Sequence, residues 1–388
     1  MEQDTEESHA LMMSHMERMF DKPWDQGIVP NEKVFLDLGS LEQLPVNFSG
    51  VLARAFDSWP ANRSIPCFDP QEQPDGKHWT HKRVQKKPAA QGLFFLKLLK
   101  TASSSSAGLH LRIARNLAQR THTDYEICRS RFLHGWAGPR MYKYGQRNRS
   151  ESFLWTMLRE PTARYVSEFF HFEVSRAKVA PTDDNFIHFL SKGKHADHHY
   201  LSWLSTGGYK FGRSDPVRSS NNILSDYDFI GVTERMDESA VCLMMLLRLK
   251  VADILHLPSK NSGGYDDGAF KNQCVYITPT VISEGIRDYI ASDGWQRYVQ
   301  PERSLYEAAN RSLDLTIEKL GRDAFQVNLA RYRHAQQLVK SRCLSKTAFP
   351  CTNTGKRIKD NAIDCLSGDL GCGFACIDEV STELGLWQ

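Results

Sequence analysis

The chain has 388 residues, of which 41% are apolar, and its formal net charge at neutral pH is +3. This apolar fraction is sufficient for a substantial core, and the small net charge does not indicate a nucleic-acid partner. The strongly apolar stretch 240–255 is interrupted by Arg248 and Lys250, so the sequence predicts no transmembrane helix.

Residues 1–88 are predicted to form an irregular amino-terminal extension with a basic linker, because short apolar pieces alternate with Pro, Asp, Gln and Lys. The first residues are acidic and lack the basic-then-apolar order of a secretory signal, which taken alone predicts a cytosolic start. Residues 89–335 are expected to form one domain, and residues 336–388 a cysteine-rich tail.

From residue 93 onward, strand-like apolar runs alternate with helical patterns. The expected strands are 93–99, 126–133, 153–158 and 229–232, and the expected helices are 107–119, 161–177, 236–249, 281–291 and 301–320. Strands separated by helices predict an α/β fold with a parallel sheet flanked by helices. Ligands of such sheets bind at the carboxyl ends of the strands, in the loops that lead into helices.

The first such loop places one cation and several hydroxyls between a strand and a helix. The candidate anion-binding residues are Lys100, Thr101, Ala102, Ser103, Ser104 and Ser105. Backbone N–H groups, hydroxyls, an ammonium and the positive end of a helix dipole meet here, which suits a phosphate or a sulfate. The loop lacks the glycines of a Walker motif, which argues against a nucleoside triphosphatase. The alternative is that the serines form a solvated turn with a helix N-cap.

A second anion-binding anchor is predicted after the strand 153–158. Arg159 follows this strand directly, and Ser167 lies about two turns along the helix that begins near Pro161. The alternative is a surface ion pair of Arg159 with Glu160 or Glu168. The stretch 107–150 holds nine Lys or Arg against two acidic residues, so it is also expected to favour anions.

His134 is the favoured general base, because it ends the strand after the first helix and therefore lies on the same rim of the sheet. His110 and His171 are weaker candidates, since both fall on predicted helices.

The segment 195–208 clusters three histidines with Tyr200 and Trp203. The spacing of His195, His198 and His199 fits no common metal-ligand pattern, so no metal site is predicted, and the aromatic residues are candidates for a sugar platform. The adjacent residues Glu234 and Arg235, after the strand 229–232, are expected to form a buried structural pair.

Five of the nine cysteines, Cys343, Cys351, Cys365, Cys372 and Cys376, lie in the last 46 residues. A tail with little apolar content usually needs cross-links, so disulfides are favoured over a zinc site, whose usual two-residue spacing is missing. Four Asn-x-Ser sequons, at Asn47, Asn62, Asn148 and Asn310, are compatible with a lumenal glycoprotein.

Taken together, these motifs resemble the sulfotransferases that use 3′-phosphoadenosine 5′-phosphosulfate (PAPS). The likeness is to the Golgi carbohydrate branch, the galactose 3-O- and uronosyl 2-O-sulfotransferases. It covers residues 91–378 in patches: "FLKLLKTASSSS", "LREPTARYVSEFFHF", "FIGVTERMDES" and "DCLSGDLGCGFACIDE". In that branch the first patch holds the 5′-phosphosulfate and the second holds the 3′-phosphate.

The resemblance implies a P-loop-like sulfotransferase fold and in-line transfer of the sulfuryl group from PAPS to a carbohydrate hydroxyl, without a metal. Lys100 would stabilise the leaving group and His134 would accept the acceptor proton. Residues 101–105 would hold the 5′ end, and Arg159 with Ser167 the 3′-phosphate. His134 matches the first histidine of a His-Gly-His motif of the uronosyl branch, whereas Trp136 replaces the second. The glycine-rich loop 258–271 would cover the adenine or the 3′-phosphate.

The implied location is the Golgi lumen, with membrane association only through a missing anchor or a partner. Two alternatives remain at this point. One is a sulfotransferase that acts on a lipid or a small alcohol, because Trp136 and the many aromatic residues suit an apolar acceptor pocket. The other is a non-catalytic protein that binds sulfated glycans through the basic region 112–149.

Overall fold

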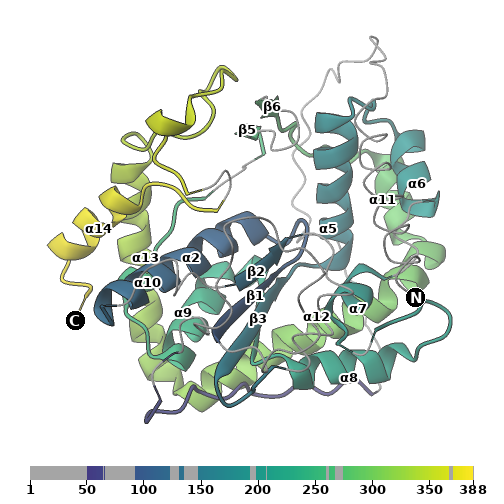
Figure 1. Cartoon of the computed structure of the whole chain (residues 1–388). Helices are drawn as coiled ribbons and strands as arrows, with labels where there is room; N and C mark the ends of the chain where they lie inside the picture. Colours follow the sequence, from purple (N-terminus) through teal and green to yellow (C-terminus); the bar gives the residue numbers. More distant parts are fainter. Residues whose placement is uncertain are drawn as a thin grey trace, which may run out of the picture.

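The computed structural model describes most of the chain from residue 50 onward (Figure 1). The described residues are 50–63, 65, 92–122, 131–134, 147–192, 198–206, 208–258, 262–266, 274–366 and 370–387, without the side chains of 131–134, 192 and 360. None of the helices in these ranges is long and apolar enough to span a membrane.

Four parallel strands form the central sheet, in the order β2-β1-β3-β4. They are β1 Gly92–Lys97, β2 Arg131–His134, β3 Ser152–Leu158 and β4 Phe229–Val232. Every residue of β1, β3 and β4 is buried, because helices cover both faces of the sheet. The predicted α/β fold with a parallel sheet flanked by helices is therefore confirmed.

The helices pack around this sheet, with α2 against β1, and α9 and α12 against β4 (Figure 1). The α-helices in the described ranges are α2 Ser103–Arg120, α5 Pro161–Glu168, α6 Asp183–Lys192, α7 His199–Leu204, α8 Pro216–Asp226, α9 Met236–Leu247, α10 Val251–Ile254, α11 Glu284–Ala291, α12 Asp293–Leu320, α13 Arg322–Cys343 and α14 Phe374–Glu383. A π-helix, η4 Phe169–Arg176, continues α5, and η6 Thr233–Arg235 and η7 Asp360–Ala362 are short 3-10 turns. A small antiparallel hairpin consists of β5 Tyr265–Asp266 and β6 Val275–Tyr276.

The largest differences from the predicted helices concern α2, α12 and α13. Helix α2 begins at Ser103, so the serines form its first turn rather than a turn before it. Helix α12 begins at Asp293 rather than at Pro301, which lies inside it. The hydroxyl of Ser292 caps the start of this helix by accepting the Trp295 N–H at 3.4 Å. Helix α13 was not predicted, and it runs through the boundary proposed at residue 335.

Residues 50–63 form a strap without helix or strand that lies against the sheet and α12. Phe56 is fully buried and belongs to the main core. The N–H groups of Arg54 and Phe56 donate to the hydroxyls of Ser312 and Thr316 on α12, at 3.0 and 2.9 Å. These hydroxyls give the strap its backbone partners in place of a sheet neighbour.

The predicted disulfides of the tail are confirmed, since all five of its cysteines are oxidised. The pairs are Cys274–Cys351, Cys343–Cys376 and Cys365–Cys372. Cys351 therefore links the tail to the β5–β6 hairpin. Cys242 is a buried free thiol in the described part of the chain, whereas Cys67 and Cys128 lie outside the described residues.

The tail also docks on α2 through direct contact between two backbones. A Cβ added to Gly108 would lie 3.0 Å from the Cα of Gly371 and 3.3 Å from the carbonyl oxygen of Leu370. Asp378 of α14 reinforces the contact through ion pairs with Arg112 and Arg115, both at 2.7 Å. Glycine is needed at position 108 because a side chain there would displace the tail.

Candidate functional site

The order of the strands places a topological switch point at the carboxyl ends of β1 and β3. The chain leaves β1 for the outer strand β2 and then returns across β1 to form β3. Connections from β1 and β3 thus depart in different directions, and such a switch point is where open parallel sheets bind ligands. Lys100 follows β1 and Arg159 follows β3, so both predicted anchors lie at this switch point.

The loop after β1 is tightly folded. Lys100 and Ala102 both have left-handed backbones, with φ of 62° and 52°. Each such residue other than glycine costs about 1–2 kcal/mol, so the surrounding structure must hold the loop in this shape. The hydroxyl of Thr101 is buried and donates to the carbonyl of Leu98 at 3.3 Å. Thr101 therefore shapes the loop, and its hydroxyl is already engaged within it.

The loop ends at the amino terminus of α2. The N-cap residue is Ala102, whose methyl group cannot accept a hydrogen bond, and the first turn contains no acidic residue. Ser103 is buried, whereas Ser104 and Ser105 are half-buried. The hydroxyl of Ser106 donates back to the carbonyl of Ala102 at 3.1 Å. The first turn thus combines backbone donors with the positive end of the helix dipole, as anion-binding loops do.

Arg159 connects the segment after β3 with the loop after β1. Its Nη1 donates to the carbonyl oxygen of Lys100 at 3.4 Å, and its Nε lies 4.0 Å from the Glu234 carboxylate. The side chain is 29% exposed, so the guanidinium remains accessible. The alternative, a surface ion pair with Glu160 or Glu168, is not formed. Glu168 instead binds Arg164 at 2.7 Å.

A buried network that the sequence did not reveal fixes the backbone of Arg159. The Tyr200 hydroxyl donates to the Arg159 carbonyl at 2.7 Å and accepts from the Arg159 N–H at 3.2 Å. The Tyr200 N–H in turn donates to Glu302 at 2.5 Å, and Glu302 also accepts from the Tyr165 hydroxyl at 3.0 Å. Burial raises the pKa of Glu302, and these donors oppose that shift.

Replacing Tyr200 with phenylalanine should lower the free energy of unfolding by about 1–3 kcal/mol, because the half-buried N–H and carbonyl of Arg159 lose their partner. Urea unfolding measures the change. Tyr332→Phe is the matched control, since Tyr332 is equally buried and its hydroxyl has no hydrogen-bond partner within the described ranges. An equal cost for the two variants would show that the Tyr200 hydroxyl does not hold Arg159.

Two predictions about neighbouring residues were wrong. Glu234 and Arg235 do not pair with each other, and Glu234 is exposed. Glu234 accepts from the Glu160 N–H at 3.0 Å and from the Tyr306 hydroxyl at 3.1 Å, whereas Arg235 pairs with Asp314 at 2.8 Å. The reason is geometric, because the 3-10 turn η6 directs adjacent side chains to different neighbours.

The expected sugar platform is largely buried. Tyr200 is inaccessible, and His198 contacts the Tyr209 hydroxyl at 2.8 Å and the Tyr298 carbonyl at 3.2 Å. His199 stacks on Trp203 with ring centroids 4.3 Å apart. His198 and His199 therefore pack within the fold, and His195 lies outside the described residues.

The proposed base, His134, ends β2 and pairs in register with Lys97 of β1. Its backbone is thus on the predicted rim, while its side chain and Trp136 lie outside the described part. His110 is buried and accepts from the Trp155 indole N–H at 3.1 Å, and His171 lies 3.6 Å from the buried Asp266. Both histidines therefore make contacts inside the fold that are typical of structural residues.

The structure describes Ser167 in full and the glycine-rich loop only in part. Ser167 lies on α5 beyond Arg159 and is half-buried. Of the loop 258–271, residue 258 and residues 262–266 are described, and β5 from this loop pairs with β6 away from the central sheet. The proposed covering of a nucleotide by this loop stays a prediction.

Aspartates pair with five of the nine basic residues of the stretch 107–150, and the side chains of the other four lie outside the described part. Arg112 and Arg115 pair with Asp378, and Arg120 binds Asp253 at 2.7 Å. Arg147 and Arg149 likewise pair with Asp228 and Asp226. These five arginines are engaged in ion pairs within the fold, so they are less available to an anionic glycan than the sequence suggested.

No family model matches the chain, and the search of curated proteins finds no match either.

Proposed function

We propose that this protein is a PAPS-dependent sulfotransferase that transfers a sulfuryl group to a carbohydrate hydroxyl. The observation that supports it best is the contact between Arg159 and the loop residue Lys100 at the switch point of a parallel sheet. A nucleotide with phosphates at both its 5′ and 3′ positions needs two such cationic anchors within reach of each other. The identity of the proposed donor, PAPS, is inferred from the resemblance of the surrounding sequence patches to the Golgi carbohydrate branch.

In this proposal the residues act mainly by position and charge. Lys100 neutralises the 5′-phosphate as it leaves, and the amides at the start of α2 hold the same group. Arg159 and Ser167 bind the 3′-phosphate, and His134 accepts the proton from the attacking hydroxyl. Residues Thr101 and Ala102 contribute through the backbone, because the Thr101 side chain donates within the loop.

The proposed location is the lumen of the secretory pathway, where disulfides persist. Three disulfides in the described residues support it. The rival proposal, a non-catalytic glycan-binding protein, is weaker because aspartates pair with five arginines of the region on which it depends.

The decisive measurement is binding of the product nucleotide, adenosine 3′,5′-bisphosphate, followed by thermal unfolding. A ligand that binds the folded state should stabilise it by about 2.7 kcal/mol at 100 times its Kd. Adenosine 5′-monophosphate, which lacks the 3′-phosphate, should bind more weakly. If neither nucleotide raises the melting temperature, the proposal fails.

Arg159→Ala should remove the preference for the 3′-phosphate. The loss of charge-assisted hydrogen bonds is expected to weaken the bisphosphate by about 1.5–3 kcal/mol, which is about 10- to 100-fold, and to leave the monophosphate little changed. Arg333→Ala is the control, since Arg333 forms an exposed ion pair with Asp237 on α13 and α9. An unchanged nucleotide preference in Arg159→Ala would assign the 3′-phosphate site elsewhere.

A further inference from the structure

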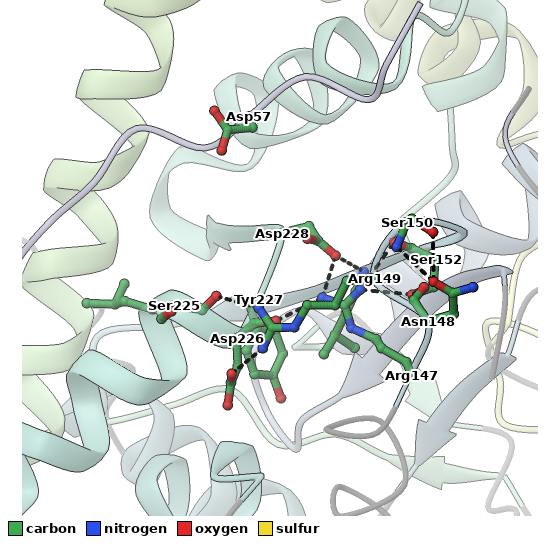
Figure 2. Close-up of polar contacts among 12 residues, drawn as sticks. Asp57, Arg147, Asn148, Arg149, Ser150, Ser152, Ser225, Asp226, Tyr227 and Asp228 are labelled. Carbon is green, nitrogen blue, oxygen red and sulfur yellow. Dashed lines mark hydrogen bonds and ion pairs between the residues drawn. The ribbon is translucent and has the colours of Figure 1, made fainter. Parts of the chain in front are cut away.

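The turn before β3 carries the sequence Asn148-Arg149-Ser150, in which the first and third side chains are hydrogen-bonded to each other (Figure 2). The side-chain oxygen of Asn148 accepts from both the N–H and the hydroxyl of Ser150, at 3.1 and 2.8 Å. Its Nδ2 donates to the Glu151 carboxylate at 2.5 Å. The turn therefore holds an asparagine amide and a serine hydroxyl next to each other at the surface.

Contacts from two arginines, one buried and one exposed, hold the backbone of this turn (Figure 2). Arg147, whose side chain is 1% exposed, donates to the Ser152 hydroxyl at 2.9 Å and pairs with Asp228 at 2.7 Å. Arg63 of the strap donates to the Ser150 carbonyl at 2.6 Å. Ser150 itself is exposed, so the arginine contacts hold the backbone of the turn while Ser150 remains accessible to solvent.

The sequon at Asn310 has the opposite environment. It lies within helix α12, where residues i and i+2 point to different sides. The Asn310 oxygen accepts from Arg235 at 2.9 Å, and the Ser312 hydroxyl is buried and accepts from the Arg54 N–H. Asn310 and Ser312 therefore lie apart, each with its own partner, in the folded protein.

We propose that Asn148 is an N-glycosylation site. The inference rests on the lumenal location proposed above and is independent of sulfuryl transfer. In the reaction the Asn148 Nδ2 bonds to the anomeric carbon of a lipid-linked oligosaccharide and gives up one proton. The bond between that carbon and the lipid pyrophosphate breaks, and the pyrophosphate leaves on the lipid.

The geometry is compatible with the glycosylated product. An amide nitrogen carries two hydrogens, and the one donated to Glu151 remains after the other is replaced. The glycan would stand at the amino-terminal end of β3, about 20 Å from Arg159 at its carboxyl end. It would therefore stand at the opposite end of this strand from the segment that carries Arg159.

The test is to secrete the full chain behind a secretory leader from eukaryotic cells and to map its peptides after treatment with peptide N-glycosidase F. Residue 148 should be recovered as aspartate. Asn148→Gln and Ser150→Ala should each remove one glycan, Ser150→Thr should retain it, and Asn310→Gln should leave the glycan number unchanged. Binding of adenosine 3′,5′-bisphosphate should not change in Asn148→Gln.

Recovery of unmodified asparagine at position 148 would overturn the inference. If position 148 is unmodified while Asn62 or Asn47 is converted, the chain is glycosylated at a different sequon from the one proposed. If no sequon is converted although the leader delivers the chain to the lumen, the inference is wrong and no sequon of this chain is an acceptor. Because the readout is peptide mass, neither result depends on whether the protein transfers sulfate.

Discussion

Lys100→Ala should lower the rate of sulfuryl transfer from PAPS by about 10²- to 10³-fold, because the variant loses the charge that meets the leaving group. The fold should be retained. Lys100 is half-buried, and alanine meets the same cost as lysine at its left-handed backbone, with φ of 62°. Transfer of labelled sulfate to a panel of sugar, lipid and small-alcohol acceptors measures the effect and identifies the acceptor class.

Lys178→Ala is the matched control for this experiment. Lys178 is also half-buried and has nearly the same backbone, with φ of 61°, but it follows η4 rather than the loop after β1. Its replacement should leave the transfer rate unchanged. A Lys100→Ala variant with the wild-type rate would exclude the proposed role of this lysine, even if the nucleotide still binds.

The second large effect concerns the Cys274–Cys351 disulfide. Its two cysteines are 77 residues apart, and the loop-closure entropy of the unfolded chain predicts a stabilisation of about 4.5 kcal/mol. The double variant Cys274→Ala/Cys351→Ala should lose that amount of unfolding free energy in a urea titration. It should also free the tail from the β5–β6 hairpin.

The Cys365–Cys372 disulfide provides an internal comparison. Its cysteines are 7 residues apart, so the same relation predicts about 2.4 kcal/mol for its removal by two alanines. The long-range pair should therefore cost about 2 kcal/mol more than the short-range pair. Equal losses would show that the stabilisation comes from native contacts rather than from the closed loop.

Local patterns were sufficient to predict the sheet. The strand 229–232 was predicted with its observed bounds, and β1 and β3 differ from prediction by at most a few residues. Strands buried on both faces read as uninterrupted apolar runs, which a single sequence reveals. The start of α2 was placed too late, because a serine run resembles a turn unless the tertiary structure shows where the helix begins.

The candidate site could be predicted only in part. Lys100 and Arg159 follow strands, so their shared rim was inferable from the topology. The Tyr200–Glu302 contact joins residues 102 positions apart, and no local pattern marks it. A glutamate within an amphipathic helix ordinarily faces solvent, and its burial becomes evident only when α12 packs against α5 and α7.

The backbone contact of Gly108 with Gly371 also sets an order of events during biosynthesis. Chains emerge from the ribosome amino terminus first, so α2 is complete long before the residues that clasp it have been made. The contact between α2 and the tail can therefore form only after residue 371 has been made. A nascent chain that has not yet reached this residue would carry the loop after β1 without the backbone contact that the tail makes with α2.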